Sequence, residues 1–174
     1  MEKNVFGLFS LMFVLVMMVS VLNIASYKAA SDRLEDALAS SGLAASLIDI
    51  RQYGIDHSIV ISDFEDAYSK YKQTLEINLG LSEGRPVGSN YIGGPVSIDV
   101  FRIYNVTGNL VTEIEVTDSG AMTLGEGELG LMRAPNGQVI EKTGIYSEIS
   151  FPLKANLAKN IIAHKSKLTF VDTV

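Results

Sequence analysis

The feature that most constrains the fold of this chain is an uncharged, apolar run at its N-terminus. Residues Val5–Ala25 (VFGLFSLMFVLVMMVSVLNIA) contain no charge and no proline, and a single glycine, Gly7, stands near the start. As a helix, about 21 residues at about 1.5 Å each match the thickness of a bilayer core. In hydrocarbon, such a helix satisfies its own backbone N–H and C=O groups. The run therefore predicts a membrane-spanning helix.

Two alternatives to an anchor are compatible with an apolar N-terminal run. A cleavable signal peptide has a basic start, a shorter apolar core and small residues at the cleavage site. Here Glu2 and Lys3 cancel, the apolar run is long, and the best small-residue site, Asn23–Ser26, is a poor one. A core helix of a soluble protein can also be apolar on every side, but a terminal helix is difficult to cover completely. The anchor is therefore favoured.

Composition bounds the rest of the chain. The 174 residues include 14 basic and 20 acidic ones, a net charge of −6. Beyond the anchor, about 150 residues remain, enough for one domain. The negative balance argues against nucleic acid, whose phosphates need a clustered basic surface, and gives little reason to expect the head to lie on anionic lipid.

Cysteine and histidine give no sign of a metal site. Cysteine is absent, which excludes disulfides and thiolate ligands. The two histidines, His57 and His164, each lack a second histidine at ligand spacing. Neither is expected to be a metal ligand or a catalytic base.

The helical pattern continues beyond the membrane edge. Residues 26–53 are rich in alanine and leucine and contain no proline, and Gly54 follows as a natural C-cap. Gly42 is expected to be a weak point where the helix can bend. The stripe of small and apolar residues on this helix is expected to pack either against other copies or against the head of the same chain. Its residues are Ala30, Leu34, Ala37, Leu38, Ser41, Ala44, Ala45 and Ile48.

An N-terminal apolar helix, an alanine-rich continuation to Tyr53 and a β-rich head together resemble the type IV pilin superfamily. The segment Arg33–Ala45 (RLEDALASSGLAA) most resembles the one after the anchor in tight-adherence (Tad-type) pseudopilins. The resemblance implies an assembly helix that uses Glu2, Val5, Phe6, Leu8, Phe9, Leu11, Phe13 and Leu15. Type IV prepilins place a glutamate at the fifth position after a cleaved leader, whereas Glu2 directly follows Met1. For Glu2, stabilisation of the helix N-terminus is therefore favoured over an assembly role.

The head begins with a short β-rich run, 57–61, and a helix. Ser62 and Glu65 form a capping-box pattern that starts this helix at Asp63. Its apolar face consists of Phe64, Ala67, Tyr68, Tyr71 and Leu75. The acids of its first turn lack a glycine-turned ligand loop, so they are interpreted as capping groups and not as calcium ligands. Five glycines and a proline make 80–94 a loop.

Alternating residues predict an antiparallel sheet of five or six strands. A hairpin is expected from 96–104, with a phase change at Phe101, and 110–117, joined at 105–109. Asn105 fits a glycosylation sequon, but a hairpin tip explains it better. Residues 125–130 match G-x-G-x-x-G, yet two glutamates there would repel phosphate, so a turn is predicted. Further strands are expected at 129–133, 138–142, 145–151 and 163–174, while 155–162 is ambiguous.

The expected protein is α+β: an anchor helix (1–27), an amphipathic stalk helix (28–54) and a head (55–174) with one helix and an antiparallel sheet. No catalytic constellation is recognisable, so no enzyme activity, cofactor or metal is expected. The resemblance implies a pilin-like subunit, major or minor, of a surface filament or of a secretion or adhesion apparatus. Its partners would be other copies or other pilin-like subunits and the membrane, with the head outside the cytoplasm. The alternative is an anchored binding module whose loop 80–94 holds a ligand or partner.

Overall fold

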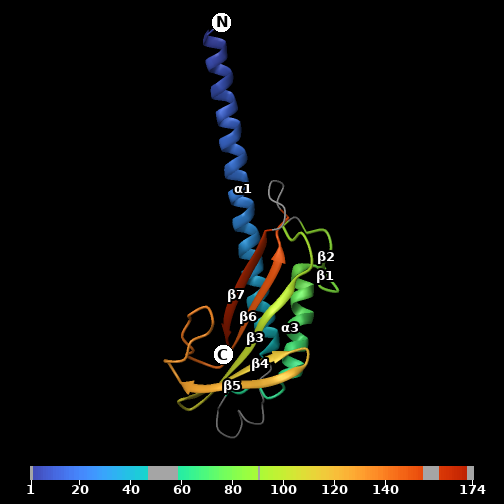
Figure 1. Cartoon of the computed structure of the whole chain (residues 1–174), viewed down its shortest axis with the longest axis vertical. Helices are drawn as coiled ribbons and strands as arrows, with labels where there is room; N and C mark the ends of the chain where they lie inside the picture. Colours follow the sequence, from blue (N-terminus) through green and yellow to red (C-terminus); the bar gives the residue numbers. More distant parts are fainter. Residues whose placement is uncertain (1, 47–58, 90, 155–160, 172–174) are drawn as a thin grey trace. The chain divides into compact units, whose positions relative to one another are not determined.

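The computed structural model describes residues 2–46, 59–89, 91–154 and 161–171, without the side chains of 2–6, 23 and 26 (Figure 1). The chain divides into two compact units, Met1–Arg33 and Leu34–Val174. The second unit starts inside the segment that the sequence assigns to a stalk, because residues after Arg33 contribute to its core. Each unit is described by itself.

The first unit is helical throughout its described residues. Helix α1 (Glu2–Ala45) continues into the second unit. It contains a stretch apolar and long enough to cross a membrane, and none of that stretch is buried. α1 ends at Ala45, where the N–H of Ser46 donates to the carbonyl of Leu43 at 3.1 Å. The rest of the predicted stalk, with Ile48 and Gly54, lies outside the described residues.

The second unit has the predicted α+β architecture (Figure 1). Five of its described strands form an antiparallel sheet in the order β5-β4-β3-β6-β7, and β1 and β2 form a separate two-stranded sheet. The elements are α3 (Phe64–Leu79), β1 (Leu81–Ser82), β2 (Arg85–Pro86), β3 (Ser97–Thr107), β4 (Leu110–Thr117), β5 (Gly120–Glu128), β6 (Gly144–Pro152) and β7 (Ile162–Phe170).

The start of α3 corrects the predicted cap. The N-cap is Asp63, not Ser62, and its Oδ1 accepts from the N–H of Asp66 at 2.9 Å. The helix is capped at its C-terminal end by Gly80, which adopts the left-handed conformation (φ 62°) that glycine allows. The predicted apolar face is confirmed, since Ala67, Tyr68, Tyr71 and Leu75 are buried and Phe64 packs against the core. Within the predicted loop 80–94, β1 and β2 form a small hairpin.

The central hairpin is confirmed with a shorter connection. β3 continues to Thr107, which pairs with Leu110, so the chain turns at Gly108 and Asn109. Gly108 makes this tight turn possible because its φ is +61°. The phase change predicted at Phe101 occurs two residues earlier, at a bulge where the register to β6 shifts between Ile98 and Val100, so Val100 packs on the outer face and not beside Ile98. One extra residue there moves the following side chains to the other face.

The region after β4 departs most from prediction. Residues 125–128, expected in a turn, belong to β5, an unpredicted strand that pairs with β4 along its whole length. β5 is mostly exposed, so it has neither the hydrophobic alternation nor the continuous apolar run by which a sequence signals a strand. The strands expected at 129–133 and 138–142 are replaced by a loop with one isolated bridge, Arg133 to Val139.

The sheet has a hydrophobic cluster on each face. On the inner face, the α1 residues Leu34, Ala37, Leu38 and Ala45 pack with α3 and with the sheet. Here Phe101 contacts two rings of α3, at centroid distances of 5.1 Å to Tyr68 and 4.9 Å to Tyr71. On the outer face, the loop after β5 contributes Leu129, Met132, Ala134 and Ile140, which pack with Tyr104, Val111, Tyr146 and Leu168.

Two polar side chains attach the segment before α3 to the sheet. The Asn105 side chain bonds to both backbone groups of Ile61: Oδ1 accepts from its N–H and Nδ2 donates to its carbonyl, both at 2.9 Å. Thr143 Oγ1 donates to the Ile59 carbonyl at 2.6 Å and accepts from the N–H of Val106 at 2.9 Å. Asn105 is predicted at a hairpin tip, but it lies within β3 and its side chain is buried.

Candidate functional site

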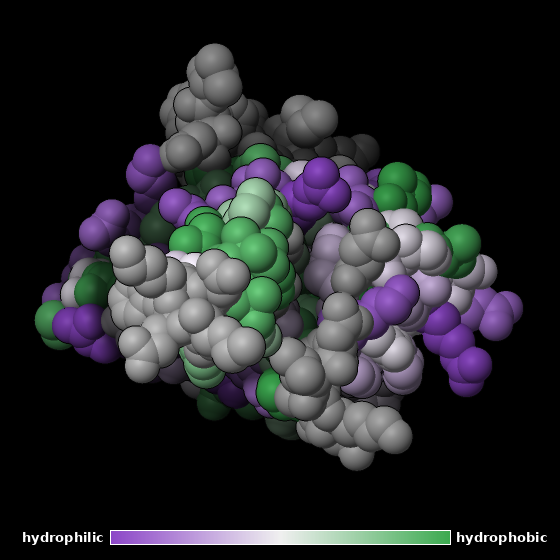
Figure 2. All heavy atoms as spheres, turned by 90° about the horizontal axis from the view of Figure 1, so that it is seen from above, coloured by the Kyte–Doolittle hydropathy of each residue, from purple (hydrophilic) through white to green (hydrophobic). Residues whose placement is uncertain are grey.

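The exposed apolar surface of α1 is the first candidate site. Leu8, Leu11 and Leu15 are 62, 60 and 53% exposed, and Phe9 and Phe13 are 69 and 64% exposed. Seen from above in Figure 2, hydrophobic side chains face the viewer in green. The side chains of Glu2, Val5 and Phe6, the other predicted assembly residues, lie outside the described set. So large an apolar surface is unfavourable in water, and it is typical of a helix that contacts lipid or another protein.

The predicted stripe is largely buried. Leu34, Ala37, Leu38 and Ala45 belong to the core of the second unit. Ala30 and Ser41 are also buried, Ala44 is half-buried, and Ile48 is not described. Within the second unit, the structure thus places the stripe against the head of its own chain.

Gly42 shows why this packing is close. A Cβ built there would lie 2.9 Å from Thr169 Oγ1 and 3.0 Å from Thr169 Cβ. The glycine is therefore needed for the approach of α1 to β7. The helix is not interrupted at this residue, since α1 continues to Ala45.

Two lysines of β7 hold the polar edge of the same contact. Lys167 Nζ lies 2.6 Å from Glu35 Oε1, and Lys165 Nζ lies 3.5 Å from Glu35 Oε2. The hydrogen bond from Lys167, followed by the charges of both lysines, lowers the pKa of Glu35. On α3, the Nδ2 of Asn78 donates to Ser40 Oγ of α1 at 2.8 Å.

The outer face of the sheet carries a polar network beside its hydrophobic cluster. Arg102 donates to Glu113 at 2.8 Å and to Glu115 at 2.9 Å. The Tyr104 hydroxyl donates to the same oxygen of Glu113 at 2.8 Å. Burial, reinforced by Glu113, raises the pKa of Tyr104. Because arginine and tyrosine satisfy both carboxylates, we interpret this network as structural.

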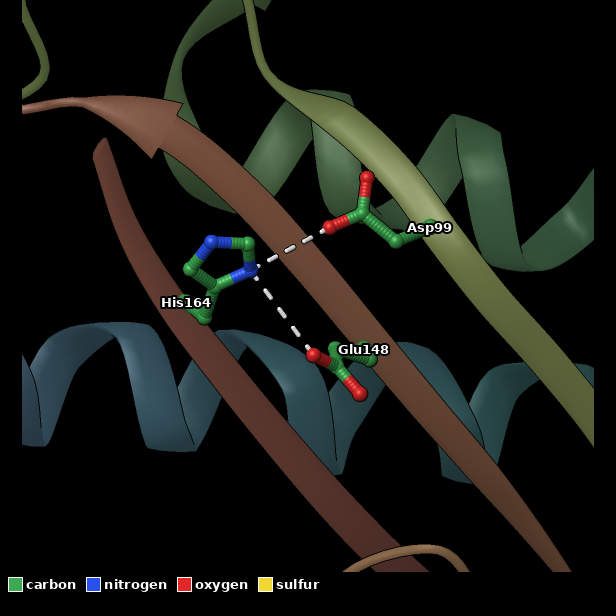
Figure 3. Close-up of side chains that lie close together, drawn as sticks. All are labelled: Asp99, Glu148 and His164. Carbon is green, nitrogen blue, oxygen red and sulfur yellow. Dashed lines mark ion pairs between the residues drawn. The ribbon is translucent and has the colours of Figure 1, made fainter.

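A second polar cluster lies on β3, β6 and β7, where Asp99, Glu148 and His164 point toward one another (Figure 3). His164 Nδ1 is 3.5 Å from Asp99 Oδ2 and 3.7 Å from Glu148 Oε1. Asp99 stands at the β3 bulge, and His164 pairs with Ser150 of β6. The three potential ligand atoms lie within 4.8 Å of one another.

Two adjoining hollows lie between α3 and the sheet. The first, about 280 Å³, is lined by residues that include Glu65, Ser69 and Asp118, and the second, about 290 Å³, extends to Leu81 and Gly84 in the predicted ligand loop. Lys72 lines both, 2.5 Å from Asp118 and over the ring of Tyr68. The hydrogen bond to Asp118 raises the pKa of Lys72, so this amine stays charged. A charged lysine is a poor nucleophile, and an anion bound here would have to share this lysine with Asp118.

Of these three residues, only His164 stands out in the sequence as a possible ligand, and Asp99 and Glu148 do not. The three residues stand on separate strands, with no short motif between them. Alternation in 145–151 does put Glu148 on the polar face, but its neighbours depend on strand order and register. Comparison of the chain with protein-family models, curated proteins and solved structures finds no match.

Proposed function

We propose that this chain is a membrane-anchored, pilin-like structural subunit, with its head outside the cytoplasm and its N-terminal helix packed among those of other subunits. The observation that carries the proposal is the exposed apolar surface of α1 from Leu8 to Ile24. A single anchor in lipid accounts for that surface. The pilin resemblance adds assembly with other copies or other pilin-like subunits.

The lower part of α1 supports the resemblance. Leu34, Leu38 and Ala45 belong to the core that α3 and the sheet build. A flexible tether needs no such core residues and is usually polar. A helix whose distal residues form part of the head is what the pilin resemblance implies.

The absence of cysteine allows a direct test of assembly. Single cysteines at Phe9 and Phe13, exposed on α1, are oxidised in native membranes, with a cysteine at exposed Ser119 of the head as the control. Packed anchors give covalent dimers from Phe9→Cys or Phe13→Cys, whereas Ser119→Cys stays monomeric. Monomers from all three variants would contradict assembly through the helix.

Topology and filament formation need separate measurements. Protease added to intact cells is expected to remove the head, and protection until lysis would overturn the outside location. Electron microscopy of surface material, with mass analysis of its peptides, shows whether filaments contain this chain as their main subunit or as a minor one.

A binding module is the second candidate, favoured by the two hollows around Lys72. Lys72, together with Leu81 and Gly84 of the predicted ligand loop, lines the second hollow. We expect Lys72→Met to abolish binding of any anionic ligand taken there while leaving cross-linking of Phe9→Cys unchanged. A thermal-shift screen of anionic small molecules on the parent and on Lys72→Met separates this function from assembly.

A further inference from the structure

We propose that Asp99, Glu148 and His164 form a binding site for a divalent transition-metal ion, best fitted by Zn²⁺. The inference is independent of the proposed assembly function, because the three side chains lie on the sheet of the head. It also reverses the expectation, drawn from histidine spacing, that His164 is no ligand.

The distances favour a shared ion over direct bonds. Charge-assisted hydrogen bonds between nitrogen and oxygen measure about 2.7–2.9 Å. The Nδ1 of His164 is 3.5 Å from Asp99 Oδ2 and 3.7 Å from Glu148 Oε1. Ligand atoms around a tetrahedral Zn²⁺, with bonds of about 2.0–2.1 Å, are about 3.3–3.4 Å apart. The two distances from His164 therefore need only a small contraction to bind an ion, and the two carboxylate oxygens, which lie within 4.8 Å of each other, would close on the same ion.

Hydroxyl groups hold both carboxylates in this arrangement. Ser150 Oγ donates to Asp99 Oδ1 at 2.9 Å, and the Tyr146 hydroxyl donates to Glu148 Oε2 at 3.2 Å. In each carboxylate the other oxygen, Asp99 Oδ2 or Glu148 Oε1, is the one nearest His164 (Figure 3). Such partners orient metal ligands and increase metal affinity.

Strand register makes the arrangement rigid. Ser150 is paired with His164, and Glu148 is paired with Val100, the residue next to Asp99. The bulge at Asp99 redirects the strand at the point where its carboxylate joins the group. Ligands on three neighbouring strands are held more precisely than ligands on loops.

The donor set indicates which ion binds. One imidazole and two carboxylates suit Zn²⁺, whereas Ca²⁺ takes six to eight oxygens and Mg²⁺ keeps most of its waters. Two carboxylates also neutralise a divalent charge. Asp99 and His164 are exposed, so a fourth position is open to water.

Calorimetric titration of the full chain in detergent with ZnCl₂ tests the proposal. We expect one Zn²⁺ per chain, and CoCl₂ should give the visible absorption of a tetrahedral complex. His164→Gln and Glu148→Gln should each weaken affinity by at least about 10-fold, because loss of an orienting partner alone costs about 10–100-fold. Ser150→Ala keeps all three ligands but removes an orienting partner, so it should weaken Zn²⁺ affinity by about 10–100-fold.

Two matched variants separate this site from other binding. Glu126→Gln makes the same charge change on β5, and His57→Gln removes the other histidine; both should leave the affinity unchanged. Far-UV circular dichroism confirms that every variant is folded. The proposal is overturned if Zn²⁺ gives no binding, or if His164→Gln binds as tightly as the parent.

Discussion

At the scale of single residues, Asn105 shows how one side chain can replace a strand. Its amide bonds to both backbone groups of Ile61, as a neighbouring strand would, and these bonds are buried. Buried backbone groups must find partners, so the asparagine supplies what the irregular segment before α3 lacks. The sequon that Asn105 begins is therefore explained by packing, with its amide already engaged.

Replacing Asn105 by alanine should destabilise the head by about 2–4 kcal/mol, because two buried backbone groups lose their partners. Thermal unfolding of the full chain in detergent measures the effect. Asn109→Ala is the matched control, since that exposed amide donates to Glu128 at 3.0 Å. Equal effects of the two variants would contradict the role given to Asn105.

Glu35 predicts a pH dependence of stability. Its pKa in the folded chain is lowered below the ordinary 4.5, first by the hydrogen bond from Lys167. A lowered folded pKa gives stability that is present above the unfolded pKa and is lost as pH falls through the folded one. The parent should therefore have a higher Tm than Glu35→Gln at neutral pH, and the difference should shrink below about pH 4.5.

The partner variant checks the origin of this effect. In a Lys167→Gln background, the Tm difference caused by Glu35→Gln should be smaller and should depend less on pH. The double variant should therefore have a Tm only slightly below that of either single variant. A Tm difference between parent and Glu35→Gln that stays constant down to low pH would contradict the ion pair as its source.

At the scale of elements, α1 serves two environments in one continuous helix. Its first part is apolar all round, while its last turns alternate between the core and the solvent. The change of pattern is visible in the sequence, but the partner of the last turns is not. Close approach to β7 at Gly42 is what allows those turns to join the head.

Gly42→Ala should destabilise the head by about 1 kcal/mol. Overpacking against Thr169 costs about 1–3 kcal/mol, and the better helix propensity of alanine offsets about 1 kcal/mol. Thermal unfolding of the full chain is the measurement. Gly7→Ala is the control, because a Cβ there meets nothing within 4 Å. A rise in Tm for Gly42→Ala would show that helix propensity outweighs the contact.

At the scale of the whole molecule, the apolar helix that is the candidate anchor and the core occupy different parts of the chain. The compact unit from Leu34 onward contains the helix α3, the five-stranded sheet and both hydrophobic clusters. A chain that begins at Ser26 should therefore remain folded, with a Tm within a few degrees of the parent, and should be soluble without detergent. Gel filtration and circular dichroism test this, and an aggregated or unfolded product would mean that the anchor is needed for folding.

The sequence by itself determined the features that depend on local pattern. Charge-free length predicted α1 as a candidate anchor, periodicity predicted the buried face of α3, and alternation predicted the β3–β4 hairpin and a phase change in β3, although two residues too late. Each of these signals is carried by neighbours in the chain, because helix and strand periods are short. The membrane and assembly roles of α1 remain proposals.

Tertiary structure alone decided the features that join distant segments. It placed the stripe from Leu34 to Ala45 in the core of its own chain, turned Gly42 from an expected weak point into a contact, and showed β5 as a strand despite its exposed pattern. It also brought Asp99, Glu148 and His164 together. The order and register of strands set these neighbours, and neither is encoded in any one stretch of residues.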